Sequence, residues 1–195
     1  MKKLVIASSN PGKLTEFRVL LSPLGIEVVT QAQLGISEAE EPHPTFIENA
    51  LAKARHASQE SGLPALADDS GICVDALNGM PGVMSARFSG FPKSDERNNR
   101  ALLDAMKSHT DRRAHYYCVL VLMRSADDTQ PLIAEGEWHG EISLQPAGDG
   151  GFGYDPLFWL PAVCKTSAQL EHEHKHVISH RSKALKVLLE KLKVL

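Results

Sequence analysis

The chain has 195 residues, 43% of them hydrophobic and 23% charged, which is enough for one ordinary globular domain, expected over residues 1–195, to bury its own core. Its formal charge is only −3, so it has no strong positive field of the kind that attracts a nucleic-acid backbone. Three separated cysteines without a CxxC pair do not indicate a disulfide framework, and no apolar run approaches the roughly 20 residues of a membrane span, so we expect a cytoplasmic protein.

Short apolar runs alternate with helical patterns in the first part of the chain. Strands are predicted over residues 4–7, 27–30 and 64–67, and helices over residues 13–21 and 45–61. Thr45 and Glu48 form a capping box at the start of the second helix. The third strand runs into Asp68 and Asp69, which we therefore expect at its end, with residues 72–77 continuing the sheet past a bend.

The second part of the chain is predicted to pair its strands. Residues 78–90, rich in Gly, Pro and Ser, predict a loop, and a helix follows over residues 95–106. β-Branched and aromatic residues make 115–123 the strongest predicted strand, joined by a polar turn to 132–141 in an antiparallel hairpin. Ser179 is predicted to cap a final helix with an apolar stripe of Leu185, Leu188, Leu189 and Leu192. We therefore expect an α/β domain with a mixed sheet.

A polar turn, Ser8-Ser9-Asn10-Pro11-Gly12-Lys13, lies between the first strand and the first helix. Backbone N–H groups and the helix dipole favour an anion at such a place, and Lys13 adds a mobile positive charge, so the turn suits a phosphate. It lacks the GxxxxGK[ST] spacing of a Walker loop. An ordinary strand-to-helix turn is the alternative.

Two acidic pairs could bind a hard divalent cation. Mg²⁺ would relieve the repulsion between Asp68 and Asp69 by binding one or two carboxylates, water and a substrate phosphate. The pair Glu40-Glu41 could supply a carboxylate to the same metal, and Lys53 could face the same cleft. The alternatives are a solvated turn, a solvated loop and an exposed helical lysine.

The segment Gly150-Gly151-Phe152-Gly153-Tyr154-Asp155-Pro156 surrounds two aromatic residues with glycines. Its backbone can approach a ligand closely and a ring can stack on a base, which favours a purine slot. A hairpin or bulge whose rings enter the core is the alternative. Later in the chain, His180 and Arg181 are adjacent donors that could bond a purine carbonyl at a helix entrance.

Taken together, five segments resemble one known family. They are Ser8–Lys13, Thr45–Ala50 with Lys53, Ala67–Gly71, Gly151–Pro156 and Ile178–Arg181. In this order, and over nearly the whole chain, they are similar to the inosine/xanthosine triphosphate pyrophosphatase family, also called the Ham1-like family. The resemblance implies an α/β fold with an elongated mixed β-sheet flanked by helices, two lobes with a central active-site cleft, and a homodimer.

The resemblance also implies an activity, which is Mg²⁺-dependent hydrolysis of non-standard purine nucleoside triphosphates, such as ITP, XTP and their deoxy forms, to the monophosphate and pyrophosphate. Asp69 would be the general base and would bind the Mg²⁺ together with Glu41. One local departure follows Glu41, where Pro42-His43-Pro44 replaces the Thr-Gly that the family often has. The implied substrate-binding residues are Ser8, Ser9, Asn10, Pro11, Gly12, Lys13 and Lys53 at the triphosphate, Ser70 in the substrate site, Phe152, Gly153, Tyr154 and Asp155 beside the base and sugar, and Lys175, His180 and Arg181 in the rest of the nucleotide pocket.

Two other functions are considered. A nucleotide-binding or sensing module without turnover would use the same loops but would lack a correctly held metal. A zinc protein is the third hypothesis, because His172, His174, His176 and His180 lie close together in the sequence, although no Cys joins them. Magnesium dependence separates the triphosphate hydrolase from the nucleotide-binding module.

Overall fold

The computed structural model describes residues 2–21 and 25–193. The strands are β1 (Lys3–Ile6), β2 (Glu27–Thr30), β3 (Ala65–Val74), β4 (Arg113–Met123), β5 (Leu132–Ile142), β6 (Phe158–Leu160) and β7 (Lys165–Thr166). The helices are α1 (Pro11–Leu21), α2 (Phe46–Ser61), α3 (Asp95–Ala105), α4 (His172–Ile178) and α5 (His180–Lys193). Short 3-10 segments are η2 (Ala32–Leu34), η3 (Asp75–Leu77), η4 (Gly82–Arg87) and η5 (Ser167–Gln169).

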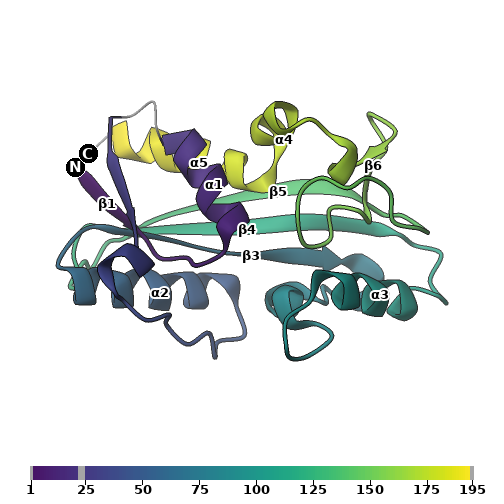
Figure 1. Ribbon diagram of the computed structural model, residues 1–195, viewed down its shortest axis with the longest axis horizontal. Coiled ribbons are helices and arrows are strands. Elements are labelled where there is room, and N and C mark those ends of the chain that lie inside the picture. The colour runs from purple at the N-terminus through teal and green to yellow at the C-terminus, as the bar shows by residue number, and fades with distance from the viewer. Residues whose placement is uncertain (1, 22–24, 194–195) are drawn as a thin grey trace. The chain divides into compact units, whose positions relative to one another are not determined.

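The strands form one mixed sheet in the order β2-β1-β3-β4-β5-β6-β7. β1 is parallel to both β2 and β3, whereas β6 is antiparallel to β5 and to β7. Helices flank this sheet (Figure 1), so the predicted α/β class with a mixed sheet is confirmed.

The chain divides into two compact units, each with its own core. The first unit comprises residues 1–69, 118–136 and 181–195. In it, α1 and α5 cover one face of the strands, and α2 lies on the opposite face (Figure 1). α2 packs closely because its buried side chains include only alanines among the apolar types. The core between α1, α5 and the strands contains Leu4, Ile6, Phe17, Leu21, Leu66, Leu120, Leu122, Leu185 and Leu188.

The second unit comprises residues 70–117 and 137–180, and its core is richer in aromatic side chains. Leu102 of α3 and Met106 after it pack into this core. The aromatic members are Tyr116, Trp138, Tyr154 and Phe158. Among the described residues of both units, no helix is long and apolar enough to cross a membrane.

Several element boundaries differ from the sequence predictions. β3 does not end at Asp68, because it continues without a bend to Val74 as one ten-residue strand, so the prediction of a strand end there is wrong. α1 begins at Pro11 rather than at Lys13, which is consistent with proline's preference for the first helical position. The final helix begins directly after Ser179, as predicted. The short elements β6, β7 and α4 were not predicted, since they are too brief to carry a periodic pattern.

Candidate functional site

The turn between β1 and α1 presents its backbone to solvent at the start of a helix. Asn10 caps α1, because its Oδ1 accepts the Lys13 N–H over 3.2 Å and its carbonyl accepts the Leu14 N–H over 3.0 Å. The Asn10 N–H in turn donates to Ser8 Oγ over 3.3 Å. Ser9, Asn10 and Pro11 are exposed, so this helix entrance is accessible to an anion.

Asp68 lies at the centre of a buried charge cluster in the first unit. Its Oδ2 is 2.9 Å from Lys13 Nζ and 3.3 Å from Arg181 Nη2. Arg181 is only 1% exposed and also pairs through Nη1 with Glu16, a buried residue of α1. The cluster therefore joins α1, β3 and the first turn of α5 through one carboxylate.

Asp69 belongs to a second cluster, on the α2 side of β3. Lys53 Nζ lies 3.1 Å from Asp69 Oδ1 and 2.7 Å from Glu41 Oε1, so this lysine bridges the two carboxylates. Asn49 Nδ2 donates to Asp69 Oδ2 over 3.4 Å. Glu41 contacts Lys53 while its neighbour Glu40 is exposed, which favours Glu41 as the acidic partner.

The alternation of side chains along β3 explains why two adjacent aspartates join different clusters. Successive side chains of a strand point to opposite faces of the sheet. Asp68 accordingly faces Lys13 on α1, and Asp69 faces Lys53 on α2. The register of β1 with β3 ends at Ile6 and Leu66, so both aspartates lie beyond the carboxyl end of β1 rather than at the end of β3.

The two aspartates have opposite pKa shifts. Burial raises the pKa of Asp68, but the charges of Lys13 and Arg181 outweigh burial and hold this pKa well below its usual value. For Asp69, burial outweighs the attraction of Lys53, so the pKa lies above its usual value. Asp68 therefore serves as a permanent anion, whereas Asp69 is the better proton acceptor.

The sequence analysis assigned no role to Glu16 or Asn49. It considered Asp68 as a metal ligand but not as an ion-pair partner. Asn49 exchanges two hydrogen bonds of 3.0 Å with the His43 backbone, which fixes the loop just after Glu41. The signal for Glu16 was its place between core positions on the inner side of α1, where a charge needs a buried partner. No local pattern revealed that Arg181, far away in sequence, would be that partner.

In the second unit, Asp155 holds the glycine-rich loop together. Its Oδ2 accepts the Phe152 N–H over 2.9 Å and Lys175 Nζ over 2.5 Å, and its Oδ1 accepts Ser167 Oγ over 2.9 Å. A Cβ at Gly151 would lie 2.0 Å from Asp155 Oδ2, so glycine is needed there for this contact. The buried Asp155 thus shapes the loop from within, and Lys175 Nζ also lies 5.0 Å from the centroid of the Phe152 ring.

His180 is part of a buried aromatic stack in the same unit. Its ring centroid lies 4.7 Å from that of Tyr116 with an interplanar angle of 10°, and 6.4 Å from that of Trp138. Burial, with the nearby charge of Asp155, raises the pKa of Tyr116 well above its usual value, so this tyrosine stays neutral. Tyr154 is also buried, and its hydroxyl donates to the Ser85 carbonyl over 2.8 Å.

The site residues expected from the resemblance thus fall into one set in each unit. The first unit contains Ser8, Ser9, Asn10, Pro11, Gly12, Lys13, Glu41, Lys53, Asp69 and Arg181. The second unit contains Ser70, Phe152, Gly153, Tyr154, Asp155, Lys175 and His180. Arg181 bonds carboxylates of the first unit while His180 stacks in the second, so their joint contact with one purine carbonyl stays a prediction.

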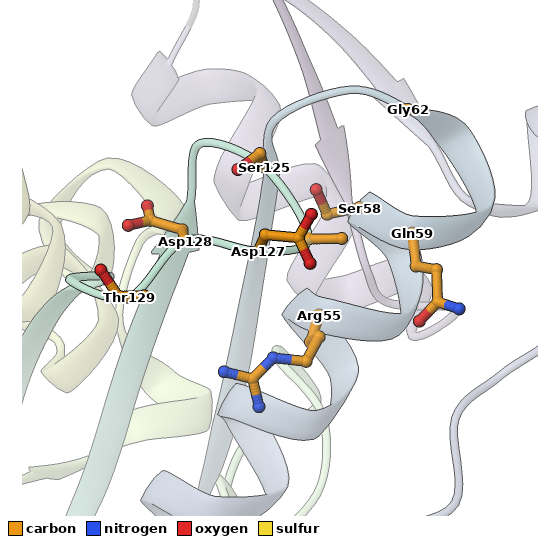
Figure 2. Close-up of a pocket in the computed structure, with 9 residues that line it drawn as sticks. Arg55, Ser58, Gln59, Gly62, Ser125, Asp127, Asp128 and Thr129 are labelled. Carbon is orange, nitrogen blue, oxygen red and sulfur yellow. The ribbon is translucent and has the colours of Figure 1, made fainter.

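A separate hollow of about 610 Å³ lies in the first unit between the end of α2 and the β4–β5 turn (Figure 2). Arg55, Asp127 and Asp128 line it, and none of the expected site residues does. Within residues 2–21 and 25–193, no group of three or more His, Cys, Asp or Glu side chains is placed to hold a metal ion.

The sequence matches the Ham1 family over residues 4–191, and the chain belongs to that family. The resemblance found in the dispersed motifs is thereby confirmed. Among its relatives is a dITP/XTP pyrophosphatase of Nitrosomonas europaea, 64% identical over 192 residues that cover 98% of this chain and 95% of that protein. A dITP/XTP pyrophosphatase of Ralstonia nicotianae is 60% identical and covers 100% of this chain and 98% of its own length.

Solved structures of Ham1 proteins have the same fold. A HAM1 protein from Coxiella burnetii is 43% identical, with a TM-score of 0.93 and full coverage of both chains. The Ham1 protein of Staphylococcus aureus is 40% identical, with a TM-score of 0.88 and 99% coverage of both chains. The arrangement of strands and helices described above is therefore an arrangement of this family.

Proposed function

We propose that this protein hydrolyses non-standard purine nucleoside triphosphates, those of inosine and xanthosine and their deoxy forms, to the monophosphate and pyrophosphate, with Mg²⁺ as cofactor. The observation that carries the proposal is the pair of clusters around Asp68 and Asp69, where two lysines and one arginine meet four carboxylates beside an exposed helix entrance. The Nitrosomonas and Ralstonia relatives are named dITP/XTP pyrophosphatases, which supports dITP and XTP as substrates.

The residues present fit a magnesium ion bound together with a substrate. Glu41 and Asp69 offer carboxylate oxygens, the hard ligands that Mg²⁺ prefers, and Mg²⁺ commonly uses one or two carboxylates while water and phosphate supply the rest. Lys53 Nζ pairs with both carboxylates, so the negative charge of Glu41 and Asp69 already stabilises one cationic group here. A bound magnesium ion would neutralise phosphate charge and polarise a phosphoryl oxygen.

In the proposed reaction, Asp69 accepts a proton from a water molecule whose oxygen attacks the α-phosphorus. The new O–P bond forms as the bond from the α-phosphorus to the bridging oxygen breaks, and pyrophosphate leaves. Lys13 and Lys53 balance the negative charge of the phosphates, while the backbone N–H groups of Ser8–Lys13 bind a phosphate at the start of α1. The raised pKa of Asp69 supports its role as the base.

We assign the base to the residues of the second unit. Phe152 and Tyr154 would flank the purine and sugar, with Lys175 and His180 completing this part of the pocket. A donor on His180 suits the 6-oxo group of hypoxanthine and xanthine and pairs badly with the 6-amino group of adenine. Because an unpaired buried donor costs about 1 to 3 kcal/mol, ATP would be disfavoured. A homodimer and a cytoplasmic location remain predictions.

The test is a pyrophosphate-release assay with the triphosphates of inosine, xanthosine, guanosine, adenosine and the pyrimidines, each with and without Mg²⁺. The proposal predicts rapid release from the inosine and xanthosine substrates with Mg²⁺, and little from ATP. Tight binding of these nucleotides without release would instead favour a sensing module. Equal rates with and without Mg²⁺ would remove the metal from the proposal.

A further inference from the structure

Two side chains of α3 bind both polar groups of the Gly153 backbone. The Gly153 N–H donates to Asp95 Oδ2 over 2.7 Å, and Asn99 Nδ2 donates to the Gly153 carbonyl over 2.7 Å. Asp95 and Asn99 are four residues apart and so share one face of the helix. Asn99 Nδ2 also donates to the Asp95 carbonyl over 2.7 Å, which holds the amide in the orientation that reaches Gly153.

These contacts hold in place a segment that has no regular secondary structure. Residues 150–155 belong to no helix or strand, and Gly153 has a φ of +62°, in the left-handed region that favours glycine. The carboxylate of Asp155 fixes the loop from inside, through the Phe152 N–H. Asp95 and Asn99 fix it from outside, at the residue between Phe152 and Tyr154.

Helix α3 is itself a firm support for the loop. Ser94 caps its start by accepting the Arg97 N–H, and Asn98 Nδ2 donates to the carbonyls of Ser85 and Ala86 over 3.3 and 3.2 Å. The Tyr154 hydroxyl donates to the same Ser85 carbonyl. The loop and the helix therefore share an anchor, and any shift of α3 would be passed to Tyr154.

We propose that Asp95 and Asn99 are positioning residues for the base-binding segment 152–155, so that they set substrate affinity rather than the rate of the chemical step. The inference rests on the proposed function, in which this segment flanks the purine while Asp69 acts on the phosphates. A segment that is already ordered before the substrate binds loses less conformational entropy on binding, which increases the affinity. Loss of either contact would therefore raise KM.

The experiment compares Asp95→Ala and Asn99→Ala with the wild type on ITP. We expect KM to rise about tenfold in each variant while kcat stays within about threefold. Each change removes one hydrogen bond that holds the base-binding segment and leaves the groups proposed to act on the phosphates in place. Asp95→Asn, which keeps an acceptor for the Gly153 N–H, should restore KM. Asp104→Ala is the matched control, because Asp104 is an exposed residue of α3 that pairs with Lys107 over 2.7 Å and is not among the residues lining the hollow beside Phe152 and Gly153.

Hydrogen exchange of residues 150–156 gives a second measurement that does not need activity. Faster exchange in Asp95→Ala, and slow exchange in Asp95→Asn and Asp104→Ala, are the expected results. An unchanged KM in both alanine variants of an active enzyme would overturn the inference, as would a fall in kcat at constant KM. A wild type that releases no pyrophosphate would instead count against the proposed function. Unchanged exchange in Asp95→Ala would by itself overturn the inference that Asp95 holds the loop in place.

Discussion

At the scale of single residues, the two adjacent aspartates of β3 are expected to behave in opposite ways. Asp69→Asn should lower turnover by about 10²- to 10⁴-fold, because it removes the proposed base. Its free energy of unfolding should be equal to or higher than that of the wild type, because burial destabilises the ionised Asp69 carboxylate and the neutral amide avoids that cost. Pyrophosphate release and urea unfolding measure the two effects. Near-normal turnover would exclude Asp69 as the base.

Asp68→Asn should instead destabilise the protein. The change leaves the buried Arg181 and the partly buried Lys13 without their shared anion, and breaking a buried ion pair on one side costs about 3 kcal/mol or more. Urea unfolding at neutral pH checks this value, with Asp69→Asn as the matched variant one position away. If both variants were equally stable, the assignment of a structural anion at Asp68 would be wrong.

The sequence was informative about which residue types matter and less so about their partners. The resemblance named Lys13, Lys53 and Asp69, and each of the three forms an ion pair in the first unit, although their roles toward a substrate stay predictions. It could not assign Glu16 to Arg181, because a buried pair separated by 165 positions leaves no local spacing. Buried pairing of this kind depends on the tertiary contact between α1 and α5.

At the scale of elements, the close packing of α2 on the sheet can be tested by overpacking. Ala54 is fully buried on the sheet-facing side of α2. Ala54→Leu should lower the free energy of unfolding by about 1 to 3 kcal/mol, because the added carbons must displace packed neighbours. Gln59→Leu introduces the same side chain at an exposed position of the same helix and should have little effect. Similar stability of the two variants in urea would contradict the packing described here.

The β4–β5 turn provides a test of pH dependence. Asp128 accepts hydrogen bonds from the Arg124 side chain and backbone and from the Gln130 N–H, and these hold its pKa below the usual value of 3.8. A lowered folded-state pKa adds stability that is present above pH 3.8 and is lost as the pH falls through the folded-state value. Asp128→Asn should therefore cost about 1 kcal/mol at pH 7.

The stability difference between Asp128→Asn and the wild type should shrink as the pH falls below about 4. Urea titrations at a series of pH values measure it, with Asp127→Asn as the control on the exposed neighbouring residue. A difference that stays constant down to the lowest pH at which the protein folds would contradict the assigned ionisation of Asp128.

Among the elements, those with a long periodic pattern were predicted well. The capping box placed α2 correctly, since Thr45 accepts the Glu48 N–H and Gly62 ends the helix in the left-handed conformation. The prediction failed at β3, where the polar run Asp68-Asp69-Ser70 suggested a strand end. Buried ion pairs compensate those polar side chains, so the strand continues through them. The polar residues therefore led to a wrong strand end, because the sequence does not show the lysines that pair with these aspartates in the folded protein.

At the scale of the whole molecule, composition and element order were enough for the α/β class, because early alternation of strands and helices favours parallel pairing and late strand runs favour antiparallel pairing. Seven strands in a mixed sheet agree with this expectation. The two lobes and central cleft that the resemblance implied stay a prediction. The element pattern alone gave no boundary between the two compact units, because β3, β4 and β5 each contribute residues to both. A boundary that cuts across strands has no linker to mark it.

The central claim is that water attacks the α-phosphorus of a purine triphosphate bound at the Asp69 cluster. It is tested most directly by hydrolysis of ITP with Mg²⁺ in ¹⁸O-labelled water, followed by mass spectrometry of the products. The account predicts IMP that carries one ¹⁸O and pyrophosphate that carries none. Label in the pyrophosphate, or formation of IDP and inorganic phosphate, would contradict it.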